Sequence, residues 1–254
     1  MENHMKSKLK AGKTVIGSFL KITDPAVIEI MGRAGFDFGI IDMEHGPIGY
    51  ETAQNLIRAA EVAGICPIIR VSENDPVCIL RALDIGAQGV EVPQIRSAKD
   101  AKKTAESARY FPEGKRGVCR YVRAARYSSM ERQEYFRKAN ESVLTIVHLE
   151  GIEAIENLDS IMSVDGVDIL FIGPYDLSQS VGVPGQVSHP SVIEQMEKVI
   201  TRAKDADKIV GTFADDISAA KRWLDVGVMY VAISVDVGIL YDACRNMVTG
   251  LGLE

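Results

Sequence analysis

The stretch that decides the fold spans residues 14–42 and reads TVIGSFLKITDPAVIEIMGRAGFDFGIID. Two short β-branched runs, Thr14 to Leu20 and Phe38 to Asp42, flank an amphipathic run from Asp24 to Ala34. The outer runs are typical of strands and the middle run is typical of a helix. Gly35 follows the helix, where glycine supplies a left-handed cap. The stretch therefore predicts a strand, a crossover helix and a second strand parallel to the first.

This unit recurs along the whole chain. Further strands are expected at Pro67 to Val71, Gly89 to Pro93, Val143 to Leu149, Asp168 to Ile172, Ile209 to Phe213 and Tyr230 to Ser234. Further helices are expected at Glu51 to Ala63, Asp75 to Asp84, Ser97 to Arg109, Ile152 to Met162, Ser191 to Lys204 and Asp215 to Asp225. Eight such units in 254 residues predict one domain, a (β/α)8 TIM barrel over residues 1–254. A doubly wound open sheet is the alternative, because strand count alone does not decide closure.

The composition is that of a globular protein with one large core, since 46% of the residues are hydrophobic and 25% are charged. A net charge of −6 argues against a chain that neutralises nucleic-acid phosphates or anionic lipid. No stretch approaches the roughly 20 apolar residues of a membrane span, and the N-terminus lacks an apolar signal core. We therefore expect a cytoplasmic protein that binds small molecules or copies of itself. Four cysteines without any CxxC spacing are expected to be reduced core thiols.

One long interval, Tyr110 to Ser142, lacks a clear strand and contains four arginines from Arg116 to Arg126. An extra helix is expected near Met130 to Ala139. We interpret the interval as an extended βα loop at the functional face or as an oligomer contact. The arginines could bind an anionic substrate tail, but a solvated or interface role fits them equally well.

Polar side chains follow four of the predicted strands, at the carboxyl ends where barrels carry their catalytic groups. These are Asp42 with His45, then Arg70, then His148 with Glu150, and finally Asp176. Because side chains alternate along a strand, Asp42, Arg70 and Glu150 can all face the barrel interior. Glu150 and Asp176 could then give a hard divalent cation two oxygen ligands and leave positions open for substrate and water.

Each of these residues also has a structural interpretation. An Asp or Glu after a strand is often an N-cap or a solvated group, His45 could be a structural histidine, and Arg70 could close a salt bridge. The convergence of four strand ends, rather than any single residue, favours a functional site. Glu91 interrupts an apolar strand and needs a partner if it is buried. We interpret Glu91 as a salt-bridged core residue or a subunit contact rather than as a third polar group of the site.

Four motifs carry a resemblance to a known family. They are Ile41-Asp42-Met43-Glu44-His45-Gly46-Pro47, Leu83-Asp84-Ile85-Gly86-Ala87-Gln88-Gly89, Arg109-Tyr110-Phe111-Pro112 with Gly117-Val118, and Phe171-Ile172-Gly173-Pro174-Tyr175-Asp176-Leu177-Ser178. Over nearly its whole length the chain resembles the HpcH/HpaI aldolases, class II pyruvate aldolases such as 4-hydroxy-2-oxo-heptanedioate and 2-dehydro-3-deoxy-sugar-acid aldolases. The resemblance implies a barrel of the phosphoenolpyruvate/pyruvate type. It also implies reversible cleavage of a 4-hydroxy-2-oxo acid to pyruvate and an aldehyde through a metal-stabilised enolate.

The same resemblance implies a role for each residue of the site. Glu150 and Asp176 would bind a divalent metal ion (Mg²⁺, Mn²⁺ or Co²⁺) that chelates the keto acid. Arg70 would stabilise the enolate oxygen. His45 would be the general base, supported by Asp42 and by Asp84, which in such proteins can come from a neighbouring subunit.

Substrate binding and assembly follow from the resemblance as well. Backbone amides in the loop formed by Gly173, Pro174, Tyr175 and Asp176 would hold the pyruvate carboxylate. His148 stands where the family has a glutamine, two residues before the metal-binding glutamate, and it would contact substrate or a metal-bound water. The chain would form a homo-oligomer, commonly a homohexamer, in which a C-terminal helix packs against a partner subunit.

The distribution of lysines bears on the mechanism. An imine-forming aldolase needs a lysine at the barrel mouth, yet none occurs in residues 22–98 or 139–197. Lys21 is the only lysine obviously placed at a strand end. This pattern disfavours a Schiff base and leaves a metal ion as the stabiliser of the enolate.

Two other functions are alternatives to the aldolase. One is an acyl-CoA-dependent lyase of the citrate lyase β type, which resembles the same superfamily. The other is a non-catalytic binding or scaffold barrel, which is disfavoured because the expected base, arginine and both metal ligands are all present.

Overall fold

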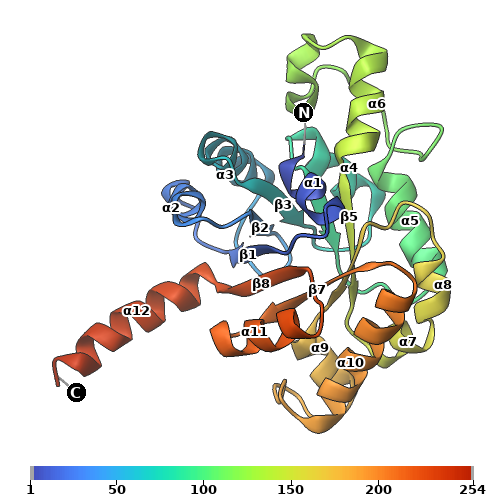
Figure 1. The fold of residues 1–254 in the computed structure, drawn as a ribbon. Coiled ribbons are helices and arrows are strands. Elements are labelled where there is room, and N and C mark those ends of the chain that lie inside the picture. Colours follow the sequence, from blue (N-terminus) through green and yellow to red (C-terminus); the bar gives the residue numbers. More distant parts are fainter. Residues whose placement is uncertain (1–2, 253–254) are drawn as a thin grey trace.

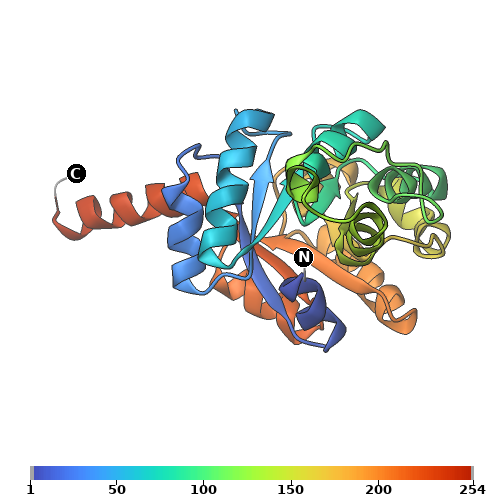
Figure 2. The same ribbon diagram turned by 90° about the horizontal axis from the view of Figure 1, so that it is seen from above.

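The computed structural model describes residues 3–252, which form a closed barrel of eight parallel strands surrounded by helices (Figures 1 and 2). Each strand pairs with the next along the chain, and the last pairs with the first. The strands are β1 (Val15–Leu20), β2 (Phe38–Asp42), β3 (Cys66–Arg70), β4 (Gly89–Val92), β5 (Leu144–Leu149), β6 (Ile169–Ile172), β7 (Ile209–Ala214) and β8 (Tyr230–Val235). The predicted TIM barrel and all eight predicted strands are confirmed to within one residue at each end. The open-sheet alternative is wrong because the ring closes.

The barrel interior has an apolar lower layer and a polar upper end. Phe38 stacks on Tyr230 in the lower layer, with ring centroids 4.0 Å apart. At the upper end, Asp42 of β2 is the registered neighbour of Arg70 on β3, and Arg70 is the registered neighbour of Glu91 on β4. Asp42 lies two residues after Ile40 and Arg70 two residues after Ile68, and both isoleucines belong to the interior cluster. Because every second residue of a strand faces the same side, the predicted inward orientation of Asp42 and Arg70 is confirmed.

The helices surround the barrel, and most of their predicted bounds hold to within two residues. They are α2 (Ala26–Ala34), α3 (Tyr50–Ala63), α4 (Pro76–Asp84), α5 (Ala98–Ala108), α7 (Ile152–Glu156), α8 (Leu158–Met162), α10 (Pro190–Asp205) and α11 (Ile217–Asp225). The helix expected from Ile152 to Met162 is interrupted at Asn157. Gly35 adopts a φ of 97°, which confirms that it supplies a left-handed cap, and Gly64 does the same after α3 with a φ of 74°.

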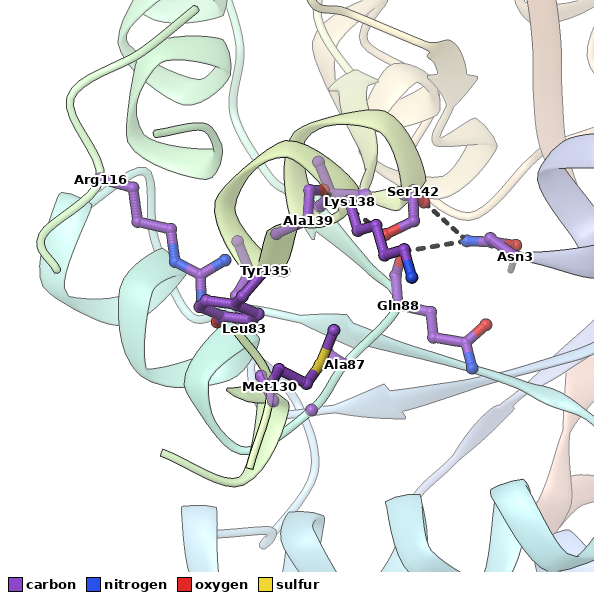
Figure 3. A pocket seen from close by; sticks show the side chains of 13 residues that line it. Asn3, Leu83, Ala87, Gln88, Arg116, Met130, Tyr135, Lys138, Ala139 and Ser142 are labelled. Atoms are coloured by element: carbon purple, nitrogen blue, oxygen red, sulfur yellow. Dashed lines mark hydrogen bonds between the residues drawn. The ribbon is translucent and has the colours of Figure 1, made fainter. Parts of the chain in front are cut away.

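A short helix that the sequence did not reveal, α1 (His4–Lys10), closes the amino end of the barrel. Its side chains Met5 and Leu9 are buried against the interior cluster. The side chain of Asn3 donates hydrogen bonds to the carbonyl oxygens of Gln88 and Ser142, at 3.2 and 3.1 Å, which ties the helix to the starts of β4 and β5 (Figure 3). The open end of the barrel is therefore its carboxyl end.

The interval from Tyr110 to Ser142 lies at the amino end of the barrel. It follows α5 and leads into β5 through the expected extra helix, α6 (Arg132–Ser142), beneath which lies a cavity of about 60 Å³ (Figure 3). Arg116 pairs with Asp84 at 2.6 Å and Arg123 pairs with Glu61. The interpretation as a βα loop at the functional face is therefore wrong, because the interval joins a helix to the start of a strand. An oligomer contact stays a prediction.

The chain ends in α12 (Asp236–Gly250), which projects away from the barrel in both views (Figures 1 and 2). Large apolar side chains such as Leu240, Tyr241 and Met247 are exposed on it. No helix within residues 3–252 is long and apolar enough to cross a membrane. All four cysteines are free, as expected, but Cys119 and Cys244 are exposed, so the expectation of core thiols is wrong for those two.

Candidate active site

The centre of the site is a buried ion pair between Asp42 and Arg70. Arg70 Nε and Nη2 donate to the two oxygens of Asp42 at 2.9 and 2.7 Å, which is a bidentate geometry. The guanidinium also lies over the ring of Phe19, 4.6 Å from its centroid. Burial opposes ionisation of Asp42, but the hydrogen bonds and charge of Arg70 outweigh it and lower the pKa of the carboxyl. Arg70 is thus held as a fixed cation at the mouth.

The loop after β2 folds back over this pair. Asp42 Oδ1 accepts hydrogen bonds from the backbone amides of Glu44 and His45, both at 3.1 Å. Glu44 Oε2 lies 3.2 Å from Arg70 Nη1 and 3.8 Å from His45 Nε2. Burial and the charge of Glu150 raise the pKa of Glu44, although Arg70 counteracts them. The His45 side chain is 59% exposed, so it can exchange protons with water.

The two expected metal ligands lie together on the opposite side of the mouth. Glu150 is 6% exposed, and its Oε1 accepts a hydrogen bond from the amide of Gln94 at 2.8 Å. Glu150 and Asp176 line the same cavity, and the charge of Glu150 acts on the carboxyl group of Asp176. Burial and the charge of Glu150 raise the pKa of Asp176. Two carboxyl groups this close repel each other unless a proton or a cation lies between them.

The loop between β6 and the short helix α9 (Pro174–Ser180) brings Asp176 to Glu150. A side chain at Gly173 would place its Cβ 3.3 Å from Glu150 Cγ, so glycine permits this close approach. The amides of Tyr175 and Asp176 belong to the first turn of α9, where backbone N–H groups have no partner within the helix. The hydroxyl of Tyr175 donates to Asp215 at 2.7 Å, so the side chain is engaged outside the carboxyl pair. The backbone amide is therefore the group of Tyr175 that can contribute to the site.

His148 lies beneath Glu150 and is almost fully buried. Its ring stacks on Phe171 with centroids 4.5 Å apart, and its Nδ1 lies 3.5 Å from Glu150 Oε1. Its Nε2 lies 3.0 Å from Glu91 Oε2, which confirms the interpretation of Glu91 as a salt-bridged core residue. Burial opposes protonation, but bonds to both carboxylates raise the pKa of His148 to about 9. The same contact with His148 outweighs burial and lowers the pKa of Glu150 to about 2.

A cavity of about 270 Å³ opens beside the two carboxylates. Glu150 and Asp176 form part of its wall, together with Gln94 and Arg96. This cavity lies at the carboxyl end of the barrel, whereas the one in Figure 3 lies at the amino end. Asp42, His45 and Arg70 do not line this cavity, so it belongs to the carboxylate side of the mouth.

Asp84 is the one expected site residue that a single chain does not bring to the mouth. It ends α4, at the amino end of the barrel, where Arg116 Nη2 donates to it at 2.6 Å. Its expected contribution from a neighbouring subunit stays a prediction.

Two contributions at the mouth were missed by reasoning from the sequence. No role was predicted for Glu44, although its position two residues after Asp42 indicates that it also lies at the mouth. Gln94 contributes a backbone amide from a left-handed conformation, with φ of 58°, and no side-chain pattern could have revealed it.

The fold and the site define a barrel with buried cationic and acidic groups gathered at its carboxyl mouth, which is the arrangement of (β/α)8 enzymes. The model of the HpcH/HpaI aldolase/citrate lyase family matches residues 15–243. The chain belongs to this family, and the resemblance inferred from the motifs is confirmed.

Individual relatives cover nearly the whole chain. A 4-hydroxy-2-oxo-heptane-1,7-dioate aldolase from Shigella sonnei (strain Ss046) is 36% identical over 255 aligned positions, which cover 100% of this chain and 97% of the relative. The crystal structure of a family protein from Burkholderia cenocepacia J2315 has a TM-score of 0.93 and 33% identity, covering 98% of this chain and 99% of that one. The citrate synthase SbnG has a TM-score of 0.86 and 30% identity, covering 98% of each chain.

Proposed function

We propose that the protein is a divalent-metal-dependent aldolase that reversibly cleaves a 4-hydroxy-2-oxo acid to pyruvate and an aldehyde. The observation that carries the proposal is that Glu150 and Asp176, two carboxyl groups on the wall of one cavity, share the barrel mouth with the fixed cation Arg70. Similarity to curated aldolases supports a carbon–carbon lyase.

The carboxyl pair fits a hard divalent cation such as Mg²⁺, Mn²⁺ or Co²⁺. A cation between Glu150 and Asp176 would relieve the same repulsion that raises the pKa of Asp176. Within residues 3–252, no three His, Cys, Asp or Glu side chains gather as a ready-made metal site. Two side-chain ligands would therefore leave most of the coordination shell to substrate and water. When bound, the cation would supply a Lewis acid for the keto oxygen.

The chain's own groups would bind pyruvate and its enolate. The free amides of Tyr175 and Asp176 at the start of α9 suit a carboxylate, because backbone N–H groups and the helix dipole both favour an anion there. Arg70 suits the developing negative charge on the enolate oxygen, since Asp42 and Phe19 already hold its guanidinium in place. Such a donor needs little reorganisation as charge develops.

His45 suits the general base that removes the proton from the substrate hydroxyl. It is exposed at the rim of the mouth, where its Nε2 lies 3.8 Å from Glu44 Oε2. Asp42 supports it through the backbone amide of His45 rather than through the ring. His148 lies behind Glu150 with both ring nitrogens facing carboxylates, so its direct contact with the substrate stays a prediction.

We also propose that the chain works as a homo-oligomer, with a homohexamer as the expected state. The exposed apolar side chains of α12 support this, because an isolated helix with such a surface is stabilised by a partner. A partner would also be needed to bring Asp84 near His45. Molar mass in solution, measured by light scattering, should fall when residues 237–254 are removed. A cytoplasmic location stays a prediction.

The acyl-CoA-dependent lyase is the second candidate, because the matched family includes citrate lyases. The deciding experiment screens the purified, metal-loaded protein for pyruvate release from several free 4-hydroxy-2-oxo acids. A parallel series offers hydroxyacyl-CoA thioesters. The aldolase proposal requires turnover of a free acid, and turnover of thioesters alone would replace it.

A further inference from the structure

Glu91 is a buried carboxylate inside the barrel, beneath the proposed metal ligands, and the proposed reaction does not use it. It is 0% exposed, and the hydroxyl of Tyr230 donates to its Oε1 at 2.8 Å. Its Oε2 lies 3.0 Å from His148 Nε2. On the other side of the ring, His148 Nδ1 points at Glu150 Oε1 at 3.5 Å. Tyr230, Glu91, His148 and Glu150 thus form one continuous chain of contacts from the core to the mouth.

We propose that Glu91 is a positioning residue that acts through His148 to orient Glu150 for the divalent cation. This inference rests on the proposed function, because it presumes that Glu150 is a metal ligand. In many metal sites a carboxylate binds the far side of a metal-ligating side chain. Such a carboxylate fixes the orientation of the ligand and changes the affinity of the site for the metal.

The contacts around Glu150 separate its two oxygens. Oε1 is held by the amide of Gln94 at 2.8 Å and faces His148. Oε2 lies on the side of Gly173, where an added Cβ would be 3.5 Å away, and Gly173 leads directly to Asp176. One oxygen is therefore anchored while the other is presented toward the second carboxylate.

Glu91 and Phe171 together fix the ring of His148. Glu91 Oε2 lies 3.0 Å from Nε2 at one edge of the ring, and Phe171 stacks on its face with centroids 4.5 Å apart. Nδ1 is thereby kept 3.5 Å from Glu150 Oε1. Without Glu91 the ring is free to turn, and Glu150 loses the neighbour that orients it.

The test is a double-mutant cycle read out as the dissociation constant of Mn²⁺, measured by calorimetry on the full-length protein without substrate. Glu91→Gln should weaken Mn²⁺ binding by about tenfold or more, within the range typical of groups behind a ligand. His148→Gln removes the ring and places the family's glutamine behind Glu150, so it should change binding by less than about threefold. The double variant should have the affinity of His148→Gln, because Glu91 then has no ring to hold.

Tyr230→Phe is the matched control. It removes a buried hydrogen bond from the same carboxylate but keeps the charge of Glu91 and its contact with His148. Its Mn²⁺ affinity should stay within about threefold of the wild type. Thermal unfolding of each metal-free variant reports any general damage to the core. If Glu91→Gln does not fold, Glu91→Asp serves instead, because the shorter side chain withdraws the carboxylate from His148, and the same loss of affinity is expected.

The outcomes separate this inference from the function on which it rests. Wild-type affinity in Glu91→Gln, or a double variant as weak as Glu91→Gln, overturns the role of Glu91. Glu150→Gln enters the same titration and should lose Mn²⁺ binding. If Glu150→Gln binds Mn²⁺ as the wild type does, the proposed metal site itself fails, and the inference fails with it.

Discussion

Two buried arginine–aspartate pairs lie at opposite ends of the barrel, and their surroundings differ. At the amino end, Arg109 donates to Asp168 at 2.8 Å, to Thr145 Oγ1 at 2.9 Å and to the carbonyl of Gly166 at 2.6 Å. Lys6 adds a second cation to Asp168 at 3.1 Å. Glu113 Oε2 lies 3.8 Å from Arg109 Nε, so two cations face two carboxylates, and the guanidinium joins several elements.

At the mouth the carboxylates outnumber the cations. Arg70 faces both Asp42 and Glu44, and the charge of Glu91 acts on it as well. Beyond them lies the carboxyl pair of Glu150 and Asp176. A buried ion pair alone is therefore no sign of catalysis, since both ends have one. The mouth is distinguished by a surplus of carboxylates, two of which, Glu150 and Asp176, line a cavity.

The largest expected effect on activity comes from removing one carboxylate of the Glu150 and Asp176 pair. Glu150→Gln should lower the rate of aldol cleavage by at least about a thousandfold, because one of two cation ligands is lost. Chelation of the wild type should have the same result, and added Mg²⁺, Mn²⁺ or Co²⁺ should restore cleavage. Cleavage rates measured after exhaustive chelation provide the check. Full activity in the metal-free enzyme would contradict the role given to the pair.

The next effect distinguishes the two histidines of the mouth. His45→Ala should lower cleavage by about 10²–10⁴-fold, the usual contribution of a general base, while pyruvate still binds. His148→Gln should be much milder, because it restores the family's residue and leaves the base intact. Steady-state cleavage and pyruvate affinity are measured for both. A near-normal His45→Ala enzyme beside an inactive His148→Gln enzyme would show that the wrong histidine was chosen.

The two arginines can be compared directly with matched variants. Arg70→Lys should slow exchange of the pyruvate methyl protons by about 10²-fold, because an ammonium cannot reproduce the geometry of a guanidinium held by Asp42. Arg109→Lys should instead lower the free energy of unfolding by about 1–3 kcal/mol and leave the exchange rate of the folded protein unchanged. Denaturant unfolding and exchange are measured for each. If Arg109→Lys also lost exchange of the pyruvate methyl protons, the proposed functional difference between the two ends of the barrel would be wrong.

The smallest effect concerns pH and stability. His148 has its pKa raised from 6.5 to about 9 in the folded state, so its contribution is fully present below pH 6.5 and is lost as pH rises through 9. The free energy of unfolding of the metal-free protein should therefore decline between pH 7 and 9. Denaturant unfolding of His148→Gln should show a shallower decline over the same range. If the free energy of unfolding declined equally with pH in both proteins, the positive charge assigned to the His148 ring would be wrong.

Most of the barrel could be predicted from the sequence because each strand and helix carries its own local periodicity. Strands such as Phe38–Asp42 were predicted with their final bounds, since alternation and flanking glycine both depend on near neighbours. The helix α1 was missed because only Met5 and Leu9 of its seven residues are buried, which is too short a pattern to recognise. The interval after α5 was placed at the wrong end, although the predicted helix before it and the predicted strand after it already marked it as a connection from a helix to a strand.

The residues of the candidate site that follow strands could be predicted from the sequence. The contacts between residues far apart in the chain could not. Asp42, Arg70, Glu150 and Asp176 were all found from their positions after strands. The contact between Glu91 and His148 joins residues 57 positions apart, so only the closed barrel brings them together. Asp84 could be assigned only through the resemblance, and a single chain leaves it at the far end.

The central claim is that this mouth forms the enolate of pyruvate with the help of a divalent cation at Glu150 and Asp176. The most direct measurement follows the methyl protons of pyruvate by NMR in heavy water, with the metal-loaded protein, the chelated protein and Glu150→Gln. The account predicts rapid exchange in the metal-loaded wild type and none above background in the other two samples. Equal exchange in all three samples would contradict it.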